Sequence, residues 1–127
     1  MPTVWVDSWQ QQCCGEPFEV GSQVAWMLRE IDREFARSVL GDDLAQSVTH
    51  AEEHHGELPE DGPAVVGRVT AIQTVHCEFA PRTGRQDNTR YPVPGTTVLS
   101  RAVSADGWEP EPDGLVFVSY LVEIADS

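Results

Sequence analysis

The alternation of apolar residues between Leu115 and Ile124 constrains the fold more than any other stretch of the sequence. Successive side chains of a β-strand point to opposite faces of a sheet, so a period of two predicts a strand with one buried face. We therefore expect a fold built mainly from β-sheet. The alternating apolar residues are Val116, Val118, Tyr120, Val122 and Ile124.

Two other long segments show the same period. In residues 18–28 the alternation is interrupted at Gly21 and Ser22, where we expect a tight turn or a bulge. Residues 64–79 are long for a single strand, and Gly67 is a place where such a strand bends as its sheet curls. The predicted apolar face of this segment carries Val65, Val69, Ala71, Val75, Cys77 and Phe79.

Residues 30–56 change to a helical period. Ile31, Phe35 and Val39 are spaced four apart, which predicts a short amphipathic helix that ends at Gly41. A second helix is expected to follow. Its predicted N-cap is Asp42, and Gly56 is its predicted C′ residue.

These elements, with shorter strands at 3–9 and 97–104, predict a mainly β protein forming one domain over residues 1–127. The expected architecture is a small five-stranded SH3-like or OB-like barrel. The helical insertion, at about residues 30–56, falls between the second and third strands. An OB-fold helix usually follows the third strand, so an SH3-like barrel fits at least as well. Residues 10–17 are predicted to form a bend between the first two strands.

The charge balance limits the classes of partner. The chain has 21 acidic and 8 basic residues and a net charge of −13, so its surface repels nucleic acid and anionic membranes on average. The first residues lack the pattern of a signal peptide, and we find no apolar run long enough to span a bilayer. Three cysteines do not make the even framework of a secreted disulfide scaffold. We expect a cytoplasmic monomer or small homo-oligomer.

Cysteine and histidine residues in three separate places predict a structural zinc site. The expected ligands are Cys13 or Cys14, His54 and Cys77, because thiolate and imidazole are the ligands that zinc prefers. Adjacent residues of an extended chain point in opposite directions, so at most one of Cys13 and Cys14 is expected to bind the ion. The alternative for Cys77 is a buried apolar role, since it is in phase with Val75.

The segment His50 to His54 matches the H-x-x-E-H pattern of inverted zinc peptidases. On a helix, His50 and His54 would share one face and bind one metal ion, with Glu53 as the general base. These peptidases need a third ligand and a much larger scaffold. We therefore favour a solvated end of an acidic helix and keep a metal-dependent hydrolase as the alternative.

The loop at residues 80–95 is the only locally basic place in the chain. Arg82, Arg85 and Arg90, with the adjacent Tyr91, have the chemistry of a site for single-stranded nucleic acid. The net charge of −13 favours an ordinary surface loop over this reading.

The four tryptophans have different expected roles. Trp26 is in phase with an apolar face and is expected in the core. Trp9 and Trp108 adjoin loops at strand ends, where they line either a ligand mouth or, as we expect, the packed end of the barrel.

Several stretches together carry a resemblance to a known family. The segments "VWVDSWQQQCCGEPFEVGSQVAW", "AEEHHG", "VHCEFA" and "YPVPG" resemble a family of small acidic actinobacterial proteins that carry a domain of unknown function. The resemblance covers most of the chain, implies a cytoplasmic bacterial protein and transfers no catalytic residue. We favour a non-enzymatic binding or interaction module whose partner is a protein or a small molecule.

Overall fold

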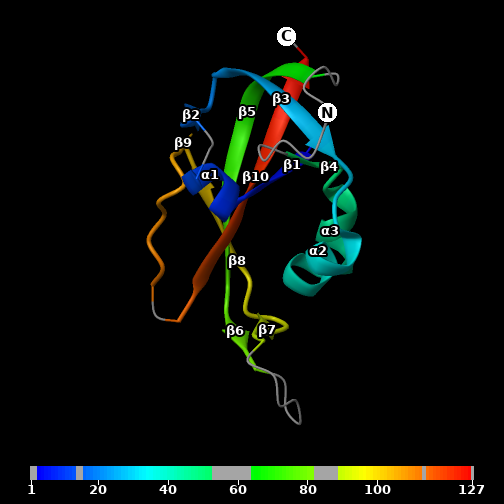
Figure 1. The fold of residues 1–127 in the computed structure, drawn as a ribbon, viewed down its shortest axis with the longest axis vertical. Helices are drawn as coiled ribbons and strands as arrows, with labels where there is room; N and C mark the ends of the chain where they lie inside the picture. Colours follow the sequence, from blue (N-terminus) through cyan, green and yellow to red (C-terminus); the bar gives the residue numbers. More distant parts are fainter. Residues whose placement is uncertain (1–2, 14–15, 53–63, 82–88, 113, 127) are drawn as a thin grey trace.

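The computed structural model describes residues 3–13, 16–52, 64–81, 89–112 and 114–126 and is mainly β, as the sequence predicted (Figure 1). The helices are α1 (Ser8–Cys13), α2 (Arg33–Leu40) and α3 (Asp42–Ser47). The strands are β1 (Thr3–Asp7), β2 (Phe18–Glu19), β3 (Gln23–Arg29), β4 (His50–Glu52), β5 (Ala64–Cys77), β6 (Phe79–Ala80), β7 (Tyr91–Pro92), β8 (Val98–Ala102), β9 (Ser104–Ala105) and β10 (Val116–Asp126). None of the helices in these ranges has the length and apolar character to cross a membrane.

The main sheet closes into a ring. Its strands pair in the order β10-β1-β4-β3-β5-β8, and β10 pairs in addition with β5. The ring therefore consists of β10, β1, β4, β3 and β5, while β8 is attached to β5 outside it. The β1–β4 pair is parallel, and the other pairs of this sheet are antiparallel. Two small sheets, β2–β9 and β6–β7, are separate from it.

Strand β5 organises the ring because both of its edges are used. One edge pairs first with β3 and then with β8, and the other edge pairs with β10 along most of its length. Gly67 lies on β5 opposite Asp126 of β10. A methyl group there would overlap Ile124 Cγ2 and would lie 2.8 Å from the Ala125 carbonyl oxygen. This position therefore requires glycine.

An inner cluster of buried side chains fills the ring. Tyr120 and Phe117 are at its centre, with ring centroids 4.9 Å apart in an edge-to-face arrangement, and Phe18 lies 5.1 Å from Trp26. Trp26 is thus in the core, as predicted. The members of the inner cluster are Val4, Val6, Phe18, Trp26, Val69, Ile72, Ala105, Phe117, Tyr120, Val122 and Ile124.

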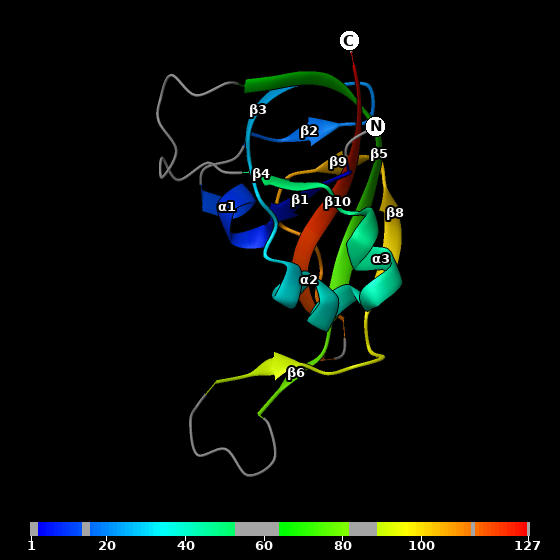
Figure 2. The same ribbon diagram turned by 90° about the vertical axis from the view of Figure 1, so that its right-hand side faces the viewer.

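An outer cluster lies on the opposite face of the same strands, where α2 and α3 are packed. In Figures 1 and 2 the two helices lie together on one side of the β5–β10 pair, away from α1 and β2–β9. Trp5 is buried in this cluster and meets Phe35 edge-to-face at 5.9 Å. The members of the outer cluster are Trp5, Val39, Val48, Ala51, Val75, Cys77, Val118 and Leu121.

Two irregularities in the pairing of β5 with β10 correct the predicted faces. Between Phe117 and Ser119 the register shifts by one residue, so Val118 joins the outer cluster while Phe117 and Tyr120 face inward. The expectation that Val118 and Tyr120 share a face is therefore wrong. An extra residue in one strand reverses the faces of all residues beyond it.

The second irregularity affects β5. Glu123 is opposite Ala71, whereas Ile124 is opposite Val69, which leaves Thr70 as an extra residue. Val69 consequently faces the inner cluster, while Val75 and Cys77 belong to the outer one. The prediction of one continuous apolar face over residues 64–79 is wrong for this reason.

The first predicted helix is confirmed. Asp32 accepts a hydrogen bond from the Phe35 N–H at 3.1 Å as the N-cap of α2, and the helix ends at Gly41, whose φ is 83°. Val39 is the buried residue of the predicted apolar face that contacts the outer cluster. The turn predicted at Gly21 and Ser22 is also present, closed by the Ser22 N–H to the Glu19 carbonyl at 2.9 Å.

The second predicted helix is much shorter than expected, and Gly41 rather than Asp42 is its N-cap. Helix α3 ends at Ser47, and the chain is extended at Val48 and enters β4 at His50. The Arg33 guanidinium donates hydrogen bonds to the carbonyls of Ala45 and Val48, which terminates the helix. Pairing of β4 with β1 and β3 then replaces helical hydrogen bonds. The helical insertion therefore spans α2 and α3, not residues 30–56.

The bend predicted at residues 10–17 is also corrected. Strand β1 ends at Asp7, and helix α1 follows at once and continues to Cys13. Gln11 holds this helix against the ring, because its side-chain amide donates to the carbonyls of Glu16 (2.8 Å) and Ala105 (3.3 Å). A polar residue buried at this position specifies how α1 docks.

Candidate functional site

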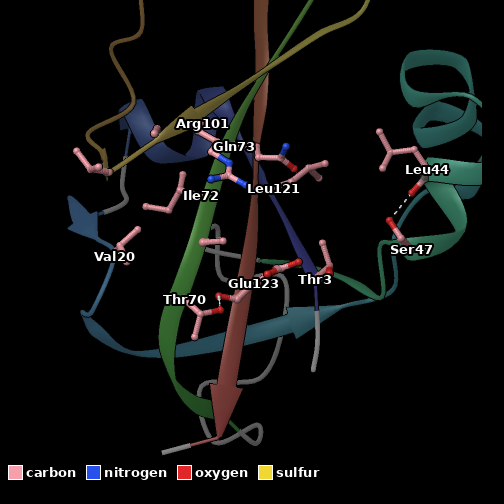
Figure 3. A pocket seen from close by; sticks show the side chains of 13 residues that line it. Thr3, Val20, Leu44, Ser47, Thr70, Ile72, Gln73, Arg101, Leu121 and Glu123 are labelled. Carbon is pink, nitrogen blue, oxygen red and sulfur yellow. Dashed lines mark hydrogen bonds between the residues drawn. The ribbon is translucent and has the colours of Figure 1, made fainter.

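A groove of about 610 Å³ lies on the outer face of the ring, beside the part that α3 covers (Figure 3). Its volume is in the range of ligand-binding sites in proteins. Six segments of the chain contribute to it: β1, the turn after β2, α3, β5, the end of β8, and β10. The lining residues are Thr3, Val20, Leu44, Ser47, Thr70, Ala71, Ile72, Gln73, Arg101, Ala102, Val103, Leu121 and Glu123.

The floor of the groove follows from strand register. Gln73 of β5 is opposite Arg101 of β8 on one edge and opposite Leu121 of β10 on the other. Two residues along the strands, Glu123 of β10 is opposite Ala71 and Thr3. Opposed residues of neighbouring strands project from the same face of a sheet, so these two rows form one surface.

Apolar side chains form the two walls. Leu44 of α3 stands on one side, and Val20 and Val103 stand on the other, as Figure 3 shows for Leu44 and Val20. The side chain of Val103 is 79% exposed, and that of Val20 is 44% exposed. A hydrogen bond from the Val20 N–H to the Val103 carbonyl, at 2.9 Å, holds these two residues side by side. The second wall is therefore fixed and offers apolar surface to solvent.

Of the described residues that line the groove, one is a cation and one is an anion, namely Arg101 and Glu123. Within the described part of the chain, neither side chain has a hydrogen bond or an ion pair. Thr70 bonds only the backbone carbonyl of Glu123, at 3.2 Å. By contrast, Arg29 bonds Asp7 at 3.2 Å outside the groove. Both charges in the groove are thus available to a ligand.

A different structure closes one end of the ring. Residues 106–112, here named the end strap, are bonded to two side chains of the core, those of Tyr120 and His76. The Gly107 N–H donates to the Tyr120 hydroxyl at 2.9 Å, and that hydroxyl donates to Glu109 at 3.0 Å. His76 Nε2 donates to the Pro110 carbonyl at 2.8 Å. The end strap is therefore a rigid cover of the inner cluster.

Burial raises the pKa of Tyr120 above the ordinary value of 10.0, and the nearby Glu109 carboxylate raises it further. The phenol stays protonated and serves as a structural donor.

Trp108 lies on the end strap with 69% of its side chain exposed, so the expectation that it packs over the end of the ring is wrong. The side chain of Trp9 lies outside the described residues.

Of the predicted zinc ligands, only Cys77 has a described side chain. Its sulfur is buried in the outer cluster, 3.4 Å from the Thr96 hydroxyl and 3.4 Å from the Glu78 carbonyl. Cys14 and His54, and the side chain of Cys13, lie outside the described residues. Across the side chains that are described, no three histidine, cysteine or carboxylate groups gather around a possible metal position.

The metal-dependent hydrolase hypothesis required His50 to lie on a helix, and the structure does not place it on one. His50 lies on β4, opposite Val4, and not on a helix. The spacing of four residues therefore no longer places two imidazoles on one helical face. Glu53 and His54 lie outside the described residues.

Of the predicted nucleic-acid residues, the two that the structure describes, Arg90 and Tyr91, lie away from the groove. Strands β6 and β7 form a small hairpin that projects from the end of β5 in both views (Figures 1 and 2). Tyr91 is on β7 and half-buried, and Arg90 is exposed beside it. Arg82 and Arg85 lie outside the described residues, so this site stays a prediction.

No motif in the sequence identifies the groove. Its signals are faint: Glu123 is out of phase with the apolar residues of its strand, and Arg101 is the one charged residue in the predicted strand at 97–104.

Comparison with known protein families gives a match to a family that has no assigned activity. The chain belongs to a family of unknown function, DUF6578. The match covers residues 1–126 and confirms the resemblance to a domain of unknown function. No curated protein and no solved structure matches the chain.

Proposed function

We propose that the protein is a non-enzymatic binding module and that the groove is its ligand site. The observation that carries this proposal is the pair of unbonded charges, Arg101 and Glu123, in a groove with fixed apolar walls. Ligand sites combine apolar surface with a few polar groups that fix orientation. The groove has this composition.

We further infer that the ring is an OB-like barrel whose strands follow one another along the chain in a circularly permuted order. Counted from β5 and continuing after β10 with β1, the five strands are β5, β10, β1, β3 and β4. In an OB-fold the first strand pairs with the second and the fourth, and the third pairs in parallel with the fifth. The observed pairs of β5 with β10 and β3, and the parallel pair β1–β4, agree with this order. Helix α1, between β1 and β3, takes the place of the usual OB helix.

This connectivity supports the groove as the ligand site. OB-folds bind ligands on the face of their second and third strands, between the loop joining strands 1 and 2 and the loop joining strands 4 and 5. The corresponding strands are β10 and β1, which supply Leu121, Glu123 and Thr3. The first of these loops corresponds to the segment with Arg101, and the second corresponds to the segment with Leu44.

The lining favours a small ligand over nucleic acid. Proteins that bind single strands stack bases on aromatic side chains in a basic channel. Among the described residues that line the groove, none is aromatic and Arg101 alone is basic. A chain with a net charge of −13 also repels a polyanion.

A structural zinc bound by Cys13 or Cys14 with His54 and Cys77 remains a separate prediction. It concerns stability and not the groove, because a structural zinc ion keeps no open position for a ligand. Elemental analysis of protein purified without added metal tests it, and sub-stoichiometric zinc alongside three freely titrating thiols would contradict it.

A groove-filling substitution tests the binding proposal. We expect Ala71→Phe to fill the floor and to weaken groove-binding fragments by about tenfold or more, because a filled site excludes its ligand. Val66→Phe is the matched control, since Val66 is on the same strand, 49% exposed and outside the groove. The readout is a fragment screen by amide chemical shifts. If no fragment shifts the groove amides, or if both variants bind fragments equally, the groove is not a ligand site.

A further inference from the structure

We propose that the ligand of the groove is a short peptide with both termini free, whose carboxylate binds Arg101 and whose ammonium group binds Glu123. This inference rests on the proposed function and names the class of ligand. It comes from the identity, spacing and surroundings of the two charges.

The two charges are of opposite sign, and no other ionisable group is found among the described residues that line the groove. An anionic ligand would be attracted by Arg101 and repelled by Glu123. A cationic ligand would be attracted by Glu123 and repelled by Arg101. A ligand that carries both charges satisfies each group. A zwitterion also has no net charge, so the net charge of −13 does not oppose its approach.

The spacing of the two charges sets the length of the ligand. Arg101 and Glu123 are on strands that both pair with β5, offset by two residues, through Gln73 and Ala71. Strand spacings of about 4.8 Å and a rise of about 3.3 Å per residue place their Cα atoms roughly 12 Å apart. An extended peptide covers about 3.3–3.6 Å per residue, so three or four residues span this distance.

The surface between the charges suits an extended peptide. In Figure 3 Arg101 and Gln73 lie at one end of the labelled set, and Glu123 and Thr70 lie farther along the strands. The Gln73 amide is able both to donate to and to accept from a peptide backbone. The walls formed by Leu44, Val20 and Val103 offer contacts to apolar side chains of the peptide.

A tetrapeptide and its blocked forms test the inference. The probe is Ala-Leu-Leu-Ala, titrated into the intact protein by calorimetry beside its N-acetylated and C-amidated forms. Charge-assisted contacts are the strong ones in such sites, so we expect each block to weaken binding about five- to tenfold. Arg101→Gln should weaken the free peptide to the same extent as amidation, and should not weaken the amidated peptide further. Glu123→Gln should show the same relation with the acetylated peptide.

Arg68→Gln and Glu78→Gln are the control variants, since both side chains are exposed and outside the groove. They should bind the free peptide as the unchanged protein does. All four replaced side chains are exposed, and circular dichroism checks that each variant is folded. Blocked peptides that bind as tightly as the free one, or Arg101→Gln and Glu123→Gln variants that behave as the controls, would overturn the inference. If neutral fragments still bind the groove in that case, the proposed function stands and only the peptide is wrong.

Discussion

The inner and outer clusters share the same strands but are closed in different ways. The inner cluster is rich in aromatic rings. Helix α1 covers it through the hydrogen bond from Gln11 to the Ala105 carbonyl, and the end strap covers it through hydrogen bonds to Tyr120 and His76. The outer cluster is mostly aliphatic and includes Val39 of α2, and the side chains packed against it are Ile31, Leu40, Phe79 and Leu99. The helices cover only part of the outer face, and the groove begins where Leu44 ends that cover.

This difference separates stability from binding. The inner face is occupied along its length, so a substitution there acts on the fold as a whole. The outer face is divided into a covered part, which includes Val39, and an open strip, which includes Ala71. We infer that the helices shape one wall of the ligand site while the ring supplies its floor.

The largest expected effect belongs to the inner cluster. Phe117→Ala removes a ring that contacts both His76 and Tyr120, and we expect the free energy of unfolding to fall by about 3–5 kcal/mol. Urea denaturation gives this value. Val103→Ala is the control, because that side chain is 79% exposed and its loss should change stability by less than about 0.5 kcal/mol. Equal losses in the two variants would mean that the ring is not packed as described.

A smaller effect is expected at the end strap. Tyr120→Phe removes the hydroxyl that joins Gly107 to Glu109, and we expect a loss of about 1–2 kcal/mol. The pH dependence gives a second readout. The pKa of Tyr120 is raised in the fold, so above about pH 10 the unfolded chain loses this proton first.

Stability should therefore fall as the pH rises through that range, and less steeply in the Tyr120→Phe variant. Urea midpoints of both proteins at about pH 8 and about pH 11 test this difference. Parallel pH profiles for the two proteins would show that burial and the Glu109 carboxylate do not raise the pKa of the Tyr120 phenol.

The smallest effect is expected in the helical cover. Asp32→Ala removes the N-cap of α2, at a cost of about 1 kcal/mol. Because α2 covers only the outer cluster, amide hydrogen exchange should accelerate in α2 and α3 and remain unchanged at Ile72. Asp32→Asn keeps a capping oxygen and should restore protection. Acceleration throughout the ring would show that the two clusters unfold as one unit.

Local patterns in the sequence predicted the elements better than the faces. The alternation near Tyr120 and the spacing of Ile31, Phe35 and Val39 identified a strand and a helix that are present. The bulges at Val118 and Thr70 could not be predicted from the sequence, because one extra residue in a strand does not change its composition.

The ends of elements were predicted less well where tertiary contacts decide them. Helix α3 ends at Ser47 because Arg33 and the pairing of β4 with β1 compete for the backbone at this point. Neither Arg33 nor β1 belongs to the segment whose apolar period predicted the helix. The groove could not be predicted for a related reason. Arg101 and Glu123 are placed on the same surface only by the register of β8, β5 and β10.

An amide chemical-shift map with Ala-Leu-Leu-Ala tests the central claim most directly, since it locates the ligand on the fold. We predict shifts concentrated at Gln73, Arg101 and Glu123, with the end strap around Trp108 unchanged. Shifts centred on Trp108, or no shift in the groove at any peptide concentration, would contradict the account.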